Sequence, residues 1–235
     1  MHSTLAEKAY FYIREKLSRG ELLPGTRLVN RTLAAEIGVS FTPVREAINQ
    51  LASEGLVEYI RGAGAYVRRI DRTELSQLYD LRATLEPFAA AEAARNITSH
   101  QMEEMYRLCD LFHTLASGLR GEQDDKTHLD LWTRWLDAEE SFHGLIFRAA
   151  ANTWLVKIAT ELRLMSMLFG PQRMGQQVLT LSNASRSWRE HARLASTLGR
   201  GDSEHAHLWM VQHIATGRTQ VLAWYDEMER SGGLS

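Results

Sequence analysis

One stretch of the sequence, residues 33–57, decides the fold of the N-terminal part and reads LAAEIGVSFTPVREAINQLASEGLV. Asn30, just before it, predicts the N-cap of a short helix, and Gly38 predicts that helix's end, because glycine accepts the left-handed conformation past a C-terminus. Thr42 and Pro43 predict the start of a second helix, as N-cap and first helical residue. Its apolar face follows the i, i+3, i+4, i+7, i+8 spacing and comprises Val44, Ala47, Ile48, Leu51 and Ala52. The stretch therefore predicts a helix-turn-helix.

The other face of the second helix is polar. Arg45 and Asn49 stand four residues apart on it, so both side chains would point away from the buried face. A helix that buries one side and exposes Arg and Asn on the other is built like a DNA-recognition helix. Because many helix-turn-helix pairs are only packing units, this pattern alone leaves DNA binding and simple packing both open.

A β-hairpin is predicted directly after this helix. Residues 56–60 and 65–67 are short β-type runs, and the basic, glycine-rich segment 61–64 joins them. A hairpin in this position is typical of a wing, whose tip can enter the minor groove or lie along phosphates. The alternative is an ordinary β-ribbon that closes a small core.

Several segments resemble the GntR family of bacterial transcription regulators. They are GELLPGTRL at 20–28, LA at 33–34, GVS at 38–40, TPVREA at 42–47, Leu51 and EGLV at 54–57. The match covers roughly residues 5–69 in order and spacing, and it implies a winged helix that binds double-stranded operator DNA. The residues that it places toward DNA are Arg31, Ser40, Thr42, Arg45, Asn49, Arg61 and Gly62. Phe41 stands where family members often carry Arg, so we expect Arg45 to be the main base-reading residue.

Composition and charge suggest a soluble protein with a basic head. Of the 235 residues, 44% are hydrophobic and 24% charged, which is typical of a globular chain. Residues 1–70 hold 10 basic against 7 acidic residues, a net charge of +3, whereas the remainder holds 17 against 22, or −5. We expect a cytoplasmic protein without a membrane span, because there is no run of eighteen apolar residues and no apolar signal segment, and Cys109 is the single cysteine.

The rest of the chain is predicted to be helical. A charged linker at residues 68–72 marks a boundary between a winged helix domain at 1–70 and an all-α domain at 73–230. The predicted helices of the second domain are 73–96, 98–119, 127–151, 153–169, 183–199 and 203–230. The fold class is therefore mainly α, with an N-terminal winged helix-turn-helix and a C-terminal bundle of six, possibly seven, helices.

Histidines recur on the apolar stripes of three bundle helices. Glu139 and His143 lie one turn apart on the third helix, while His191 and His213 lie on the inner faces of the last two. A neutral imidazole offers a lone pair and a carboxylate offsets cationic charge, so the set could bind a divalent metal. The alternative is that the histidines are hydrogen-bonded core residues and that Glu139 pairs with one of them. The remaining histidines are interpreted as surface or packing residues: His2, His100, His113, His128, His205 and His207.

The bundle resembles the effector domain, abbreviated FCD, of the FadR subgroup of this family. The matching positions are LYDLR at 78–82, Glu86-Pro87, Phe142-His143, Asn152, Glu190-His191, Gly201-Asp202 and His213. The resemblance spans roughly residues 73–220 and implies an all-α bundle that binds a small effector. It also implies a divalent ion, such as zinc, nickel or manganese, with four protein ligands: Glu139, His143, His191 and His213. Glu139 departs from the family pattern, which has Asp, so the geometry and the preferred metal stay open.

Arg82 is a candidate for binding the effector. It lies on the apolar face of the first bundle helix, so its guanidinium would point inward. A buried guanidinium needs an acidic partner, which a small carboxylate ligand would provide. The alternative is a pair with Glu86 one turn away, or an arginine whose charged end simply reaches solvent.

These observations predict a homodimeric, ligand-responsive bacterial transcription regulator rather than an enzyme. A small organic acid would bind near the metal and alter the relative placement of two DNA-binding heads. One alternative is a metal-dependent enzyme, because such a site can hold an activated water. No separate general base or nucleophile set supports that reading. A pure metal sensor is the other alternative.

Overall fold

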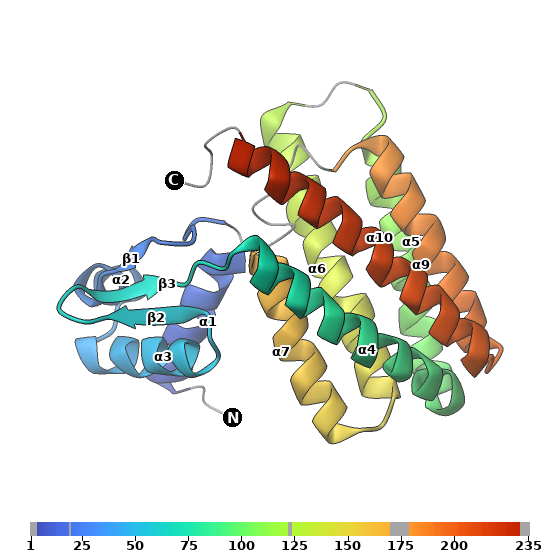
Figure 1. Cartoon of the computed structure of the whole chain (residues 1–235), viewed down its shortest axis with the longest axis horizontal. Helices are drawn as coiled ribbons and strands as arrows, with labels where there is room; N and C mark the ends of the chain where they lie inside the picture. The colour runs from blue at the N-terminus through green and yellow to red at the C-terminus, as the bar shows by residue number, and fades with distance from the viewer. Residues whose placement is uncertain (1–3, 19, 122–123, 170–178, 231–235) are drawn as a thin grey trace. The chain divides into compact units, whose positions relative to one another are not determined.

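The computed structural model describes residues 4–18, 20–121, 124–169 and 179–230 (Figure 1). Contacts within the chain define two compact units. One comprises residues up to Asp71 together with a segment that starts at Met165, and the other comprises the remaining residues. The domain limits of 1–70 and 73–230 stay a prediction.

The first unit contains a helix-turn-helix and a three-stranded antiparallel sheet. Its helices are α1 (Leu5–Ser18), α2 (Asn30–Ile37) and α3 (Phe41–Ser53), and its strands are β1 (Arg27–Leu28), β2 (Val57–Ile60) and β3 (Gly64–Val67). The strand order is β1-β3-β2, and Tyr66 on the central strand lies opposite both Arg27 and Glu58. The predicted winged helix-turn-helix is therefore confirmed. The sequence analysis missed β1, whose two residues are too short a run to show a period.

Burial in α3 follows the predicted pattern. Val44, Ala47, Ile48 and Leu51 are buried, whereas Arg45, Glu46, Asn49 and Gln50 are exposed. The predicted N-caps were wrong: α2 begins at Asn30 after Val29, and α3 begins at Phe41 after Ser40, and neither capping residue makes a side-chain cap bond. Gly38 does end α2, with a φ of 75°.

The second unit is a helical bundle. Its helices are α4 (Arg72–Asn96), α5 (Ser99–Gly118), α6 (Asp125–Ala149), α7 (Thr153–Phe169), α9 (Leu181–Gly199) and α10 (Ser203–Arg230), and of α7 it includes the residues up to Leu164. The six predicted helices are confirmed, with ends that differ by at most a few residues. Side-chain caps explain three of the starts, because Thr98, Asp124 and Thr180 each accept a hydrogen bond from a backbone N–H three residues on. The possible seventh helix stays a prediction, because residues 170–178 are outside the described part of the chain.

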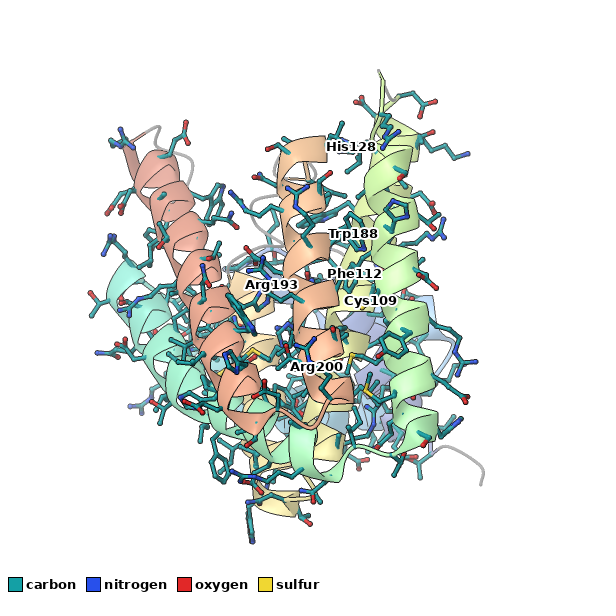
Figure 2. The ribbon with its side chains drawn as sticks, turned by 90° about the vertical axis from the view of Figure 1, so that its right-hand side faces the viewer. Cys109, Phe112, His128, Trp188, Arg193 and Arg200 are labelled. Carbon is teal, nitrogen blue, oxygen red and sulfur yellow. The ribbon has the colours of Figure 1, made fainter. Side chains whose placement is uncertain are left out.

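Helix α6 supplies much of the core of the bundle. It packs against both α4 and α5, while α9 packs against α5 and α10, and α10 packs along α4. Figure 2 shows α9, marked by Trp188 and Arg193, between α5 and α10. Large aromatic side chains fill the interior, among them the fully buried Phe112, Phe142 and Phe147. Among the described residues, no helix is both long and apolar enough to span a bilayer.

Candidate metal centre

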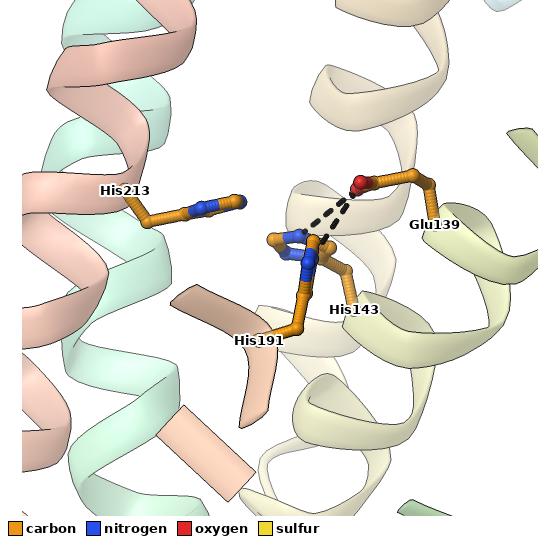
Figure 3. Close-up of side chains that lie close together, drawn as sticks. All are labelled: Glu139, His143, His191 and His213. Atoms are coloured by element: carbon orange, nitrogen blue, oxygen red, sulfur yellow. Dashed lines mark ion pairs between the residues drawn. The ribbon is translucent and has the colours of Figure 1, made fainter. Parts of the chain in front are cut away.

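Four potential metal ligands converge inside the bundle (Figure 3). Helix α6 presents Glu139 and His143 one turn apart, α9 presents His191, and α10 presents His213. Each residue offers a ligand atom, and these atoms all lie within 4.8 Å of one another. His143 and His191 are buried, and the other two are partly exposed. The tertiary structure therefore brings together all four residues, which the sequence had placed on the stripes of three helices.

The inward-facing nitrogens of two imidazoles have no hydrogen-bond partner in the described part of the chain. Nε2 of His143 lies 3.6 Å from Oε2 of Glu139, and Nε2 of His191 lies 3.5 Å from the same oxygen. Among the described residues, both nitrogens are buried and accept or donate no hydrogen bond. A buried polar atom without a partner is costly, and coordination to a cation would satisfy both nitrogens at once. These residues fit a divalent ion.

In each of the three imidazoles, the nitrogen that faces away from the centre, Nδ1, contacts a protein oxygen. Nδ1 of His143 lies 3.1 Å from Oε2 of Glu86, and Nδ1 of His213 lies 3.1 Å from Oε2 of Glu190. Nδ1 of His191 lies 2.8 Å from the backbone oxygen of residue 187. If each Nδ1 carries the proton, it donates to these oxygens and leaves the lone pair of Nε2 for a metal. Sequence reasoning did not identify this outer layer, because two of its three contacts join different helices.

A buried arginine that the sequence analysis did not single out also contacts this centre. Nη2 of Arg163, on α7, donates to the backbone oxygen of Glu139 at 3.0 Å and to its Oε2 at 3.1 Å. The Ser187 hydroxyl donates to Oε1 of the same carboxylate at 3.4 Å. No motif or stripe distinguished Arg163 from the other charged residues of its helix.

Electrostatics favour an ionised glutamate and a neutral histidine. Burial raises the pKa of the Glu139 carboxyl, but the nearby His191 and Arg163 outweigh it and hold that pKa well below its ordinary value. Burial, followed by the charge of Arg163, holds the pKa of His143 well below its ordinary value. A carboxylate and a neutral imidazole are the forms that bind a metal.

Arg82 has an acidic partner on its own helix. Its Nε donates to Oε1 of Glu86 at 2.5 Å, and its guanidinium lies 4.7 Å from the centre of the Tyr79 ring. Burial raises the pKa of Glu86, but Arg82 and the hydrogen bond from His143 outweigh it and lower that pKa. Of the alternatives for Arg82, the structure shows the pair with Glu86. A direct role in effector binding stays a prediction.

The seven residues predicted to contact DNA are exposed in the first unit. Arg45 and Asn49 lie on the outer face of α3, and Gly62 occupies the wing turn with a φ of 78°. The Tyr59 hydroxyl on β2 donates to Oδ1 of Asn49 at 2.8 Å, which the sequence analysis missed. The other four are exposed near the same elements: Arg31, Ser40, Thr42 and Arg61. Their contacts with DNA stay a prediction.

The remaining histidines lie away from the centre or outside the described residues. Nε2 of His128 contacts the backbone oxygen of Leu179, and the His113 ring lies against Trp188. His100, His205 and His207 are exposed. His2 is outside the described part of the chain.

Models of two protein families match the chain. The model described as the FCD domain matches residues 77–216, and the model described as bacterial regulatory proteins, gntR family, matches residues 5–67. The two matches cover the bundle and the winged helix respectively.

Curated relatives extend over most of the chain. The probable D-xylose utilization operon transcriptional repressor of Paenarthrobacter nicotinovorans is 28% identical over 215 residues, which cover 91% of this chain and 87% of that protein. The HTH-type transcriptional regulator LutR of Bacillus subtilis (strain 168) is 26% identical, over 90% of this chain and 98% of that protein. Among solved structures, E. coli McbR/YncC has a TM-score of 0.76 at 23% identity and covers 93% of this chain and 99% of that one. The last similarity supports the fold.

Proposed function

Because the chain belongs to the GntR family of bacterial regulatory proteins and carries an FCD domain, we propose that a divalent metal in the bundle helps it to bind a small carboxylate effector. Like its relatives, the protein is a transcription regulator. It binds DNA, responds to a ligand and is not an enzyme. The metal and the chemical class of the effector are the parts that we propose.

The metal proposal rests on the Nε2 atoms of His143 and His191. Neither has a hydrogen-bond partner among the described residues, and both lie beside the carboxylate of Glu139. With His213, these residues would hold the ion through three imidazoles and one carboxylate. Zinc, nickel and manganese all accept such ligands. When bound, the ion would supply positive charge and a coordination position for an oxygen of the effector.

The charge balance around the centre supports an anionic effector. Two guanidinium groups, of Arg82 and Arg163, face two carboxylates, of Glu86 and Glu139, around the neutral His143. These four charges offset one another in the ion-free protein. A divalent ion would add two positive charges to a buried site, where uncompensated charge is costly. A ligand with one or two carboxylates would restore the balance.

The winged helix would bind operator DNA as a homodimer in the cytoplasm, where bacterial DNA lies. A second copy is supported by exposed apolar side chains on two helices that pack together, α4 and α10. Leu81 is 51% and Phe88 47% exposed on α4, and Leu208 is 53% exposed on α10. Leu81 and Phe88 are seven residues apart and so lie on one face of α4, and an exposed apolar face is typical of a protein interface. A dimer would present two recognition helices to two half-sites.

A mutant series tests the shared metal site. We expect purified wild type to bind one ion per chain, His191→Ala to lose it, and His191→Ala/His213→Ala to lose nothing more, because the ligands act as one unit. His100→Ala, at an exposed histidine, is the matched control. Metal content would be measured by mass spectrometry after incubation with zinc, nickel or manganese. A wild type that binds none of them refutes the metal centre.

A second experiment separates the effector proposal from a pure metal sensor. Operator affinity of the metal-loaded protein would be measured by gel shift with and without small carboxylic acids. An effect of metal alone, unchanged by any acid, identifies a metal sensor. If an acid still changes operator affinity after the metal is removed, the acid is an effector but the ion takes no part in its binding.

A further inference from the structure

Helix α7 supplies none of the four proposed ligands, yet it places a charged group at the centre. The side chain of Arg163 is only 8% exposed, and its Nη2 donates to both the backbone oxygen and the carboxylate of Glu139. Removing a guanidinium from water costs several kcal/mol, so such a group is retained where it has an anionic partner. In the structure that partner is Glu139.

Three contacts of the Glu139 side chain meet at one atom, Oε2. Its Oε2 lies 3.1 Å from Nη2 of Arg163, 3.5 Å from Nε2 of His191 and 3.6 Å from Nε2 of His143. An ion bound between the imidazoles and this carboxylate would therefore compete with Arg163 for the same oxygen. The guanidinium would also lie one ligand away from the ion, where like charges repel. Above about pH 7, a carboxyl and an imidazole of ordinary pKa are already in the forms that bind a metal, so the remaining effect of the Arg163 charge is to oppose metal binding.

This opposition is resolved if a second anion enters with the ion. A guanidinium binds a carboxylate through two parallel hydrogen bonds, and this geometry favours Arg over Lys. When the ion takes Oε2 of Glu139, Arg163 can donate instead to a carboxylate bound beside the ion. The exchange leaves every buried charge with a partner of opposite sign.

Arg82 is less suited to the same exchange. It holds Glu86, which is 1% exposed, and Glu86 in turn holds Nδ1 of His143. If Arg82 turned to a ligand, it would leave a fully buried carboxylate without its guanidinium. If Arg163 turned to a ligand instead, the ion would take its place beside Glu139 and would replace its positive charge.

We propose that Arg163 makes the metal centre selective for anionic ligands. Without the ion, Arg163 donates a hydrogen bond to the carboxylate of Glu139. Once that carboxylate coordinates the ion, Arg163 binds a carboxylate of the effector. The assignment rests on the proposed metal and carboxylate function and names the residue that recognises the acid. It also requires two effects of opposite sign: Arg163 weakens the binding of the ion and strengthens the binding of the anion.

The test measures both affinities in the full chain. Zinc binding to chelator-treated protein and the binding of acetate and succinate to zinc-loaded protein would be measured by calorimetry, with acetamide as an uncharged control ligand. The variants are Arg163→Gln, which removes the charge, and Arg163→Lys, which keeps it without the planar pair of donors. Arg107→Gln, at an exposed position on α5, is the matched control. Thermal unfolding of each protein checks that it is folded.

We expect Arg163→Gln to bind zinc about tenfold more tightly, because a like charge has been removed from beside the ion. It should bind both acids about tenfold or more weakly, because a charge-assisted hydrogen bond has been lost. Arg163→Lys should bind zinc like wild type and bind the acids less tightly than wild type.

Three other results would overturn the assignment in different ways. Unchanged acid affinity in Arg163→Gln removes Arg163 from recognition while the proposed function stands. Weaker binding of both zinc and acid in Arg163→Gln and Arg163→Lys, relative to Arg107→Gln, shows a structural role only. A wild type that binds zinc but neither acid, or no zinc, refutes the proposed function and this inference with it.

Discussion

At the scale of single residues, one nitrogen of each imidazole, Nδ1, contacts a protein oxygen, and the other, Nε2, is left for a metal. Glu86, Glu190 and the backbone oxygen of residue 187 each contact one Nδ1, so the three rings are oriented without an ion. Such outer contacts set the tautomer and reduce the ordering that metal binding would otherwise require. The site is therefore largely preformed.

The buried His143 should make the ion-free protein sensitive to mild acid. Its pKa is held well below the ordinary value, chiefly by burial and then by Arg163. As the pH falls, the His143 imidazole therefore takes up a proton in the unfolded chain before it does so in the folded protein. The contribution of the neutral, buried imidazole to the free energy of unfolding is complete above about pH 6.5 and is lost as the pH falls below that value. We expect the free energy of unfolding, measured by urea titration with chelator present, to fall between about pH 6.5 and pH 5.

His143→Gln should lack this part of the pH dependence, whereas His100→Gln, at an exposed histidine, should retain it. The depressed pKa values of Glu86 and Glu139 act at lower pH, because a carboxylate in an unfolded chain titrates near pH 4. The same slope in wild type and His143→Gln would show that another group titrates in this window.

At the scale of elements, a hydrogen bond joins α3 to the wing. The bond between Tyr59 of β2 and Asn49 of α3 ties the strand to the outer face of the helix. Asn49 is therefore held in place before any DNA binds, while Arg45 projects from the same face. Prior ordering of this kind lowers the entropy lost on binding.

Arg45→Ala should abolish specific operator binding while the fold is kept, because Arg45 is exposed and the buried face of α3 is unchanged. The loss of a bidentate contact with guanine would cost roughly 1–3 kcal/mol per half-site. Gel-shift titrations on operator and on unrelated DNA would separate specific from nonspecific binding. Operator affinity equal to that of Arg95→Ala, an exposed control on α4, would remove Arg45 from its role.

Arg61, in the wing, should act mainly through phosphates. Its loss in Arg61→Ala should make the plot of log affinity against log salt concentration less steep by about one phosphate contact per wing. Affinity would be measured between low and physiological salt, with Arg95→Ala again as the control. Identical slopes for Arg61→Ala and wild type would argue that the wing does not approach DNA.

At the scale of the whole molecule, the proposed regulation requires two copies of the chain to associate through the bundle. The exposed apolar side chains of α4 and α10 are the surface that we propose for this contact, and α10 packs along α4 within one chain. A charge placed inside such an interface has no partner and is costly to bury.

Phe88→Glu should therefore convert a dimer to monomers without unfolding the bundle. Light scattering would report the subunit number, and the variant should bind metal like wild type. Leu129→Glu, at a 48% exposed position on α6, is the matched control and should stay dimeric. A dimeric Phe88→Glu would place the interface elsewhere on the chain.

The sequence by itself determined the helices, the winged helix and the stripes on which the candidate ligands lie. These features depend on local periodicity, on glycine and proline positions and on familiar motifs, all of which can be read from neighbouring residues. Glu139 and His143 are one turn apart on any helix, so their pairing was predictable. The resemblance to FCD domains then linked them to His191 and His213.

Only the tertiary structure decided how the centre is supported and which arginine reaches it. The contact between Glu86 and His143 spans 57 residues, and that between Arg163 and Glu139 spans 24. Helical periodicity places a side chain on a face but does not specify which partner from another helix meets it. For Arg82, the sequence allowed both a ligand and Glu86, and the structure shows the pair with Glu86. A buried charge must find its counter-charge in three dimensions, and the separation of residues along the chain does not record that distance.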